Sequence, residues 1–140
     1  MIAIPAKDIG LLEYKIRPML DKALDNTSDP QIDNTDHWIE LLKCGAVYCF
    51  ISKGFEFLCI CSTTNRIFYI NIVAGSNLKK YAQNCIEDIS SFANFLGCKM
   101  IISQARLGAA KELKKNGFNE VKYAKKHVTM MKVIGDSTYY

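Results

Sequence analysis

The segment Val73-Ala74-Gly75-Ser76-Asn77-Leu78-Lys79-Lys80 contains the residue types that bind phosphate at the start of a helix. Its glycine lets the backbone approach a ligand closely, and either Ser76 or Asn77 can cap the helix that follows. The first turn of such a helix has unpaired N–H groups and a partial positive charge, which favour a bound phosphate. The two lysines oppose the helix dipole unless an anion binds. An ordinary cap beside two solvated lysines explains the same residues.

Arg106 is a second candidate for ligand binding, because it opens a predicted helix directly after a predicted buried strand. Ligands of α/β folds bind at the ends of such strands. A guanidinium pairs bidentately with a phosphate or a carboxylate. A structural ion pair or a surface side chain with a buried stem explains Arg106 equally well.

Proton transfer needs an acid and a base, and the sequence assigns neither. Glu40 and Glu56 have carboxylates that can accept a proton from an amine, but neither residue lies in a motif that fixes its geometry. The catalytic residues therefore stay unassigned.

The six cysteines are expected to be reduced, small, buried residues. Zinc sites usually draw their ligands from close pairs such as C-x2-C, and these cysteines lack that spacing. Cys59 and Cys61 alternate on one predicted strand and so share a face, as core residues do. The two histidines, His37 and His127, are far apart. No metal site is predicted.

The first predicted helix spans residues 8–25, where apolar residues recur every three or four positions. Pro18 interrupts this stripe. Because proline disfavours helical geometry at the residue before it, we expect either a kink near Arg17 or two short helices. Residues 25–35 (DNTSDPQIDNT) have the composition of a turn.

The same periodicity predicts three more helices. A short one begins with Thr35 or Asp33 as its N-cap and ends at Gly45, and its inward residues are Trp38, Leu41 and Leu42. The longest covers residues 78–96 and the last covers residues 107–115, and a glycine follows each of them.

Six strands are predicted from runs rich in Val, Ile, Phe and Tyr. The first three form an antiparallel meander, the fourth lies between the last two helices, and the final pair closes the chain. Their ranges are 46–52, 55–61, 66–73, 98–103, 118–123 and 127–134. The tail at 135–140 is expected to be frayed. This order of elements gives a mixed α/β fold, expected as a single domain over residues 1–140.

The order resembles that of the GNAT (GCN5-related N-acetyltransferase) acyltransferase fold, in which a meander leads to a long cofactor-side helix and then to a strand, a helix and a strand pair. The segment Ala109-Ala110-Lys111-Glu112-Leu113-Lys114-Lys115-Asn116-Gly117-Phe118 is similar to the family's A-x-x-L-Y-x-x-x-G-F signature. The resemblance implies that the signature helix turns through glycine into the next strand.

The resemblance also implies acetyl-CoA as the cofactor. In this family the central strand splays from its neighbour so that pantetheine pairs with exposed backbone, and a loop reading Q/R-x-x-G-x-G/A holds the pyrophosphate. The present chain has one glycine and no arginine at the start of that loop. The family's acid, a tyrosine, corresponds to Leu113, and its asparagine corresponds to Arg106. The implied cofactor-binding residues are Val73, Gly75, Ser76, Asn77, Lys79 and Arg106.

The chain is further similar to small phage-encoded GNAT-like proteins, which have an I-x-P-x-L-x-x-A-L stretch, a tryptophan helix, a G-C strand entry and an R-x-G-W turn. The matching residues are Ile16, Pro18, Leu20, Ala23, Leu24, Gly97, Cys98, Arg106, Leu107 and Gly108, with Ala109 in place of the last tryptophan. This resemblance implies a phage-type acyl-CoA-dependent N-acetyltransferase with a degenerate pyrophosphate loop. The alternative is a non-catalytic accessory or virion protein that uses the fold as a protein-interaction scaffold.

Composition limits the other possibilities. The chain has 140 residues, 49% of them apolar and 23% charged, which excludes a disordered protein. Its net charge of +4 is spread along the sequence, and the small basic turn at Lys122, Lys125 and Lys126 is expected to be solvated, so nucleic acid is not an expected partner.

The expected partners are an acyl-CoA and an amine-bearing acceptor if the protein is active, and otherwise a protein partner or a second copy. No apolar run approaches the roughly 18 to 20 residues of a membrane helix. The N-terminus also lacks the apolar stretch of a secretory signal. We therefore expect a cytoplasmic protein, in the host cytoplasm or the virion if it is viral.

Overall fold

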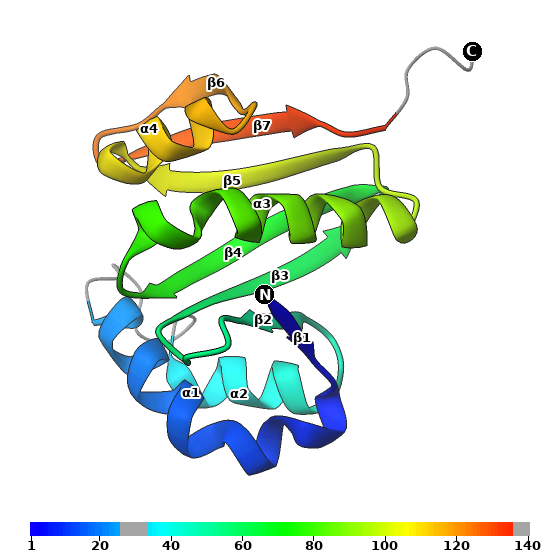
Figure 1. The fold of residues 1–140 in the computed structure, drawn as a ribbon, viewed down its shortest axis with the longest axis vertical. Coiled ribbons are helices and arrows are strands. Elements are labelled where there is room, and N and C mark those ends of the chain that lie inside the picture. Colours follow the sequence, from blue (N-terminus) through cyan, green and yellow to red (C-terminus); the bar gives the residue numbers. More distant parts are fainter. Residues whose placement is uncertain (26–33, 136–140) are drawn as a thin grey trace. The chain divides into compact units, whose positions relative to one another are not determined.

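A computed structural model describes residues 1–25 and 34–135. These residues form a mixed α/β fold with one sheet in the strand order β1-β2-β3-β4-β5-β7-β6 (Figure 1). The elements in chain order are β1 (Ile2–Ile4), η1 (Ala6–Asp8), α1 (Ile9–Leu24), α2 (Thr35–Lys43), β2 (Tyr48–Ile51), β3 (Phe57–Thr64), β4 (Ile67–Gly75), α3 (Leu78–Phe95), β5 (Met100–Arg106), α4 (Leu107–Lys115), β6 (Asn119–Tyr123) and β7 (His127–Val133). The mixed α/β class predicted from the sequence is confirmed.

The chain divides into two compact units, and each is described by itself. The first comprises Met1–Cys61 and Ile72–Asn77, and the second comprises Ser62–Asn71 and Leu78–Tyr140. The prediction of a single domain over residues 1–140 stays a prediction.

In the first unit, antiparallel strands β1, β2 and β3 are accompanied by α1 and α2. Its buried core consists of Ile9, Ile16, Leu20, Ile39, Leu42, Val47, Cys49, Ile51, Leu58, Ile60, Ile72 and Ala74. The predicted apolar stripe on α1 is confirmed, since Ile9, Ile16 and Leu20 lie in this core. Its remaining members pack against the core and are Leu12, Met19, Ala23 and Leu24. β1 was not predicted, because three residues are too few to show a period of two.

Helix α1 passes through Pro18 without a break, so the alternative of two short helices is wrong. Ile16 and Leu20, on either side of the proline, are both fully buried. Burial of each such side chain contributes roughly 1.5 to 3 kcal/mol, so the two together match or exceed the cost of about 3 kcal/mol for proline inside a helix. Core packing therefore keeps the helix continuous.

The N-cap of helix α2 lies one residue away from each of the two predicted N-caps, Asp33 and Thr35. Asn34 is the cap, and its side-chain oxygen accepts a hydrogen bond of 2.8 Å from the backbone N–H of His37. The helix ends in a Schellman turn, in which Gly45 (φ +78°) donates to Leu42 and Ala46 donates to Leu41. The predicted stop at Gly45 is therefore confirmed.

In the second unit, parallel β4 and β5 are followed in the sheet by β7 and then by β6. Helix α3 buries the predicted stripe through Ala82, Cys85, Ile86, Ile89 and Ala93. The rings of Phe68 on β4 and Phe92 on α3 meet edge to face at 6.0 Å. β5 begins and ends later than predicted, at Met100 and Arg106.

The β3–β4 connection is tighter than predicted. β3 continues to Thr64, and only Asn65 and Arg66 link it to β4. Both residues have positive φ, as a two-residue type I′ turn requires. The predicted turn at residues 25–35 lies largely outside the described residues, and the predicted frayed tail lies almost entirely outside them. No described helix combines the length and the apolar character needed to cross a membrane.

Candidate functional site

The parallel ladder between β4 and β5 ends before β5 does. Its last pair in the second unit is Ile70 with Ser103. β5 continues to Arg106 and stays paired with β7 up to the pair of Arg106 with His127. Among the described residues of this unit, Asn71 and Gln104 are thus the first corresponding positions that do not pair.

A cavity of about 250 Å³ lies where the pairing stops. Its lining residues are Tyr69, Ile70, Asn71, Ile102 and Gln104. Asn71 donates a hydrogen bond of 2.8 Å from Nδ2 to Ser62 Oγ on β3. The cavity therefore combines aliphatic walls with side-chain amides at the point of strand separation.

The first turn of α3 has no acidic residue to balance the positive end of the helix dipole. Lys79 and Lys80 are both exposed there, and Lys80 Nζ lies 5.1 Å from the ring centre of Tyr81. The first turn of this helix therefore adds two positive charges to the positive end of the helix dipole.

Arg106 occupies the N-cap position of α4 and is exposed. Its side chain makes no capping hydrogen bond and, within the described part of the chain, no ion pair. Of the two alternatives considered for this residue, a structural ion pair is therefore not observed, and the guanidinium is available for an anion.

The turn after β4 belongs to the first unit and is shaped by Glu56. At Gly75, where φ is +105°, an added Cβ would overlap the carbonyl oxygen of Glu56 and crowd the side chain of Met19. The backbone N–H of Ser76 donates to that same oxygen at 2.9 Å. The close approach that requires glycine here is thus made by the chain's own backbone, and the N–H of Ser76 is already paired.

Asn77 and Val73 flank this contact. Asn77 adopts a left-handed conformation (φ +62°) and donates from Nδ2 to Glu56 Oε2 at 3.1 Å. Val73 is 43% exposed on β4. Four of the predicted cofactor residues thus lie together in the first unit, whereas Lys79 and Arg106 belong to the second.

Sequence reasoning named Glu56 only as an unassigned base and missed its contacts with the turn after β4. The residue is held in place by Ser52, whose buried Oγ accepts the backbone N–H groups of Glu56 and Phe57 at 3.1 Å each. The predicted meander contained the signal, because an antiparallel hairpin places the start of one strand beside the end of the next.

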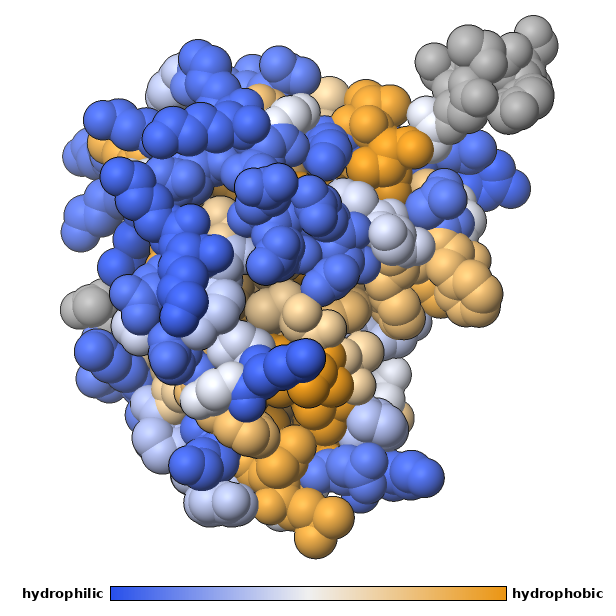
Figure 2. All heavy atoms as spheres, viewed as in Figure 1, coloured by the Kyte–Doolittle hydropathy of each residue, from blue (hydrophilic) through white to orange (hydrophobic). Residues whose placement is uncertain are grey.

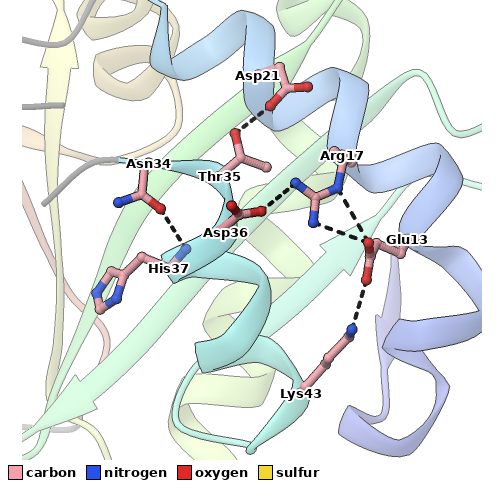
Figure 3. Close-up of polar contacts among 8 residues, drawn as sticks. All are labelled: Glu13, Arg17, Asp21, Asn34, Thr35, Asp36, His37 and Lys43. Carbon is pink, nitrogen blue, oxygen red and sulfur yellow. Dashed lines mark hydrogen bonds and ion pairs between the residues drawn. The ribbon is translucent and has the colours of Figure 1, made fainter. Parts of the chain in front are cut away.

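The densest charged cluster joins α1 to α2 in the first unit (Figure 3). Arg17 donates to Asp36 Oδ1 at 2.7 Å and to Glu13 Oε2 at 3.1 Å, and Lys43 lies 2.8 Å from Glu13 Oε1. Hydrogen bonds from Lys43 and Arg17 hold the pKa of Glu13 below its ordinary value of 4.5. Since these charges pair with one another, the cluster connects two helices and offers no free group.

The cysteines do not form a metal site. Cys49, Cys59, Cys61, Cys85 and Cys98 are buried and Cys44 is exposed, all of them free thiols. Burial raises the pKa of Cys49 to about 12. The described residues contain no group of three His, Cys, Asp or Glu side chains that could hold a metal ion.

No protein-family model and no curated protein matches this sequence. Solved structures do match the fold. Aminoglycoside 6'-acetyltransferase type Ii superposes with a TM-score of 0.72 at 12% identity, covering 97% of this chain and 99% of its own. The chain has the GNAT fold.

Two other GNAT-fold structures are similar over nearly the whole chain. The PaiA N-acetyltransferase from Thermoplasma acidophilum, solved with coenzyme A, gives a TM-score of 0.67 at 8% identity, covering 95% of this chain and 99% of its own. Arylalkylamine N-acetyltransferase 2 from Aedes aegypti gives a TM-score of 0.64 at 15% identity, covering 96% of this chain and 98% of its own. At these identities the likeness shows the GNAT fold alone.

Proposed function

We propose that this protein binds an acyl-CoA beside Asn71 and Gln104 and transfers the acyl group to an amine. The observation that carries the proposal is that β5 keeps its pairing with β7 while its ladder with β4 stops at Ser103. Backbone N–H and C=O groups require partners, so a strand separation leaves positions at which an amide-containing chain such as pantetheine can pair.

The phosphate groups of the cofactor are assigned to cations of the second unit. Lys79 in the first turn of α3 and Arg106 at the start of α4 are exposed and have no acidic partner among the described residues. Both belong to helix N-termini, whose dipoles favour anions. Val73, Gly75, Ser76 and Asn77 of the first unit stay candidate cofactor-binding residues.

The proposed acceptor is a primary amine. Two of the proteins with similar folds are, by name, an aminoglycoside acetyltransferase and an arylalkylamine acetyltransferase. In the transfer, a C–N bond forms, the C–S bond of the thioester breaks, and the proton lost by the amine is taken up so that the thiol leaves neutral. No residue of this chain is assigned as the base.

A non-catalytic scaffold is the second candidate, and Leu113 favours it. This residue is half-buried in α4, at the position where the resemblance implies a tyrosine acid. A leucine side chain cannot protonate a leaving thiolate. A protein of this second kind keeps the fold and acts through a protein partner or a second copy of itself.

Thermal unfolding with and without acetyl-CoA tests the binding step. At 100 times the dissociation constant the ligand stabilises the fold by about 2.7 kcal/mol, which raises the melting temperature by about 9 °C for a chain of this length. Gln104→Trp, which fills the cavity, is expected to abolish that shift. Thr63→Trp, at an exposed position of β3 away from the cavity, is the matched control and keeps it. A chain that millimolar acetyl-CoA does not stabilise refutes the proposal.

Thiol release from acetyl-CoA, with an aminoglycoside or an arylalkylamine as acceptor, separates the two candidates. Leu113→Tyr supplies the missing acid and is expected to raise the rate at least about tenfold, whereas Leu113→Phe supplies only the ring. If acetyl-CoA binds but neither the native chain nor Leu113→Tyr releases thiol, the scaffold is the better account.

A further inference from the structure

The positive charge of this protein is concentrated in one part of the second unit. Residues 106–132 contain eight Lys and Arg residues and two Asp and Glu residues, a net charge of +6, whereas the whole chain carries only +4. The exposed members, which we call the basic face, are Arg106, Lys111, Lys114, Lys115, Lys122, Lys125 and Lys126. The expectation that the charge is spread along the sequence therefore does not hold for residues 106–132.

The elements that carry the basic face pack together. Helix α4 contacts both β6 and β7, and Lys114 on α4 lies 3.7 Å from Glu120 on β6. All five residues of β6 are exposed. The surface over α4 and β6 is largely hydrophilic in Figure 2. The lysines thus lie on neighbouring elements, and each of them is exposed to solvent.

Most of this charge is not neutralised. Lys114 and Lys115 have acidic partners at 3.7 and 3.4 Å, and both side chains are 66% exposed, so these pairs are weak. The other five cations of the basic face have no ion-pair partner among the described residues. Clustered like charges repel one another, and an anionic partner with several charges relieves that repulsion.

An exposed aromatic residue, Tyr123, lies between the basic residues along the chain. Tyr123 is 64% exposed at the end of β6, and its hydroxyl donates a hydrogen bond to Glu120. The next four residues form a turn closed by the bond from Ala124 N–H to the His127 carbonyl at 2.9 Å. Lys125 and Lys126 occupy the two central positions of that turn. Proteins that bind single-stranded nucleic acids combine positively charged residues with exposed aromatic rings on which the bases stack.

We propose that the basic face binds single-stranded nucleic acid, with its cations on the phosphates and Tyr123 stacked on a base. An extended acidic peptide would have to add to β6 as a new strand. The irregular register between Glu120 and Lys122, and the lysine on this edge, oppose strand addition. Because lysine contacts phosphate as a point charge, the binding is expected to be independent of sequence.

Fluorescence anisotropy with a labelled twelve-residue oligothymidylate measures this binding. Four phosphate contacts predict a slope of about −3 for log affinity against log salt, which is a loss of about 50-fold between 50 and 200 mM NaCl. The triple variant Lys122→Gln, Lys125→Gln, Lys126→Gln is expected to reduce the slope by about 2. Tyr123→Leu is expected to weaken binding about tenfold at every salt concentration.

The matched control changes the same number of charges in the first unit. Lys7→Gln, Lys22→Gln and Lys53→Gln together are expected to alter the affinity less than twofold. The proposal is overturned if the native chain does not bind at 50 mM NaCl or if both triple variants weaken binding equally. It is also overturned if duplex DNA binds more tightly or if polyglutamate competes as well as the oligonucleotide does. None of these outcomes depends on acetyl-CoA, so the test is independent of the proposed transferase activity.

Discussion

Asn71 and Gln104 occupy corresponding positions one residue beyond the last pair of β4 with β5, and both line the cavity at that point. The amide of Asn71 is committed to Ser62 on β3, on the other side of β4 from β5. Its side chain therefore does not bridge the gap toward Gln104. The hydrogen bond of Asn71 to Ser62 on β3 is thus compatible with the separation of β4 from β5.

Replacing Gly75 by alanine is expected to destabilise the protein by about 3 kcal/mol. A non-glycine residue at positive φ costs roughly 1 to 2 kcal/mol, and overlap of the new Cβ with Glu56 adds a similar amount. Gly97→Ala is the matched control, because its φ is +82° but nothing lies within 4 Å of the added Cβ. Urea unfolding should give Gly97→Ala a free energy of unfolding about 1 kcal/mol lower than that of the native chain. Equal losses for both variants would contradict the predicted steric contact.

Stability is expected to fall in acid because of Glu13. The pKa of this carboxyl is lower in the folded chain than in the unfolded chain, since Lys43 and Arg17 bond its charged form. Its contribution is therefore complete above about 4.5 and is lost as the pH falls through the lowered value. Urea unfolding of the native chain and Glu13→Gln from pH 7 to pH 3 measures this difference. The difference in free energy of unfolding between the native chain and Glu13→Gln should decrease below pH 4.5. A difference that stays constant would exclude this role for the ion pairs.

A single thiol is expected to react in the native protein. Cys44 is exposed, whereas the other five cysteines are buried and Cys49 has its pKa raised to about 12. Because the thiolate is the reactive form, a thiol reagent at pH 8 should modify one group at once and six after denaturation. Cys44→Ser should abolish the fast reaction. A fast reaction that persists in this variant would mean that a buried cysteine is accessible.

Removing the cap of α2 is expected to cost about 1 kcal/mol. In Asn34→Ala the backbone N–H of His37 loses its acceptor. Asn34→Asp keeps an acceptor at the same place and should restore the urea midpoint. Full stability in Asn34→Ala would show that Thr35 or Asp33 can take over the cap.

The parts of the fold that were predictable are those in which local pattern and tertiary packing agree. Helix α3 shows its stripe over five turns, so its buried residues could be read from the sequence. The cap of α2 could not be chosen, because Asp33, Asn34 and Thr35 are all good caps and only the helix's position in the core selects among them.

The sequence suggested the turn after β4 and Arg106 as candidate site residues, but it did not suggest Asn71 and Gln104, which line the cavity. Gly75 was singled out because glycine lets the backbone approach a ligand closely, whereas the atom that lies close to it in the structure is the carbonyl oxygen of Glu56, nineteen positions earlier. Such a long-range contact leaves no local pattern. The same holds for Arg106, because its having no ion-pair partner among the described residues depends on what the fold brings near it.

The hydroxyl of Ser52 has a consequence for how this protein can evolve. It orients the backbone of Glu56, whose side chain in turn bonds Asn77, so a substitution at one of these three positions disturbs the others. When homologous sequences are aligned, Ser52, Glu56, Asn77 and Gly75 should vary as a correlated set.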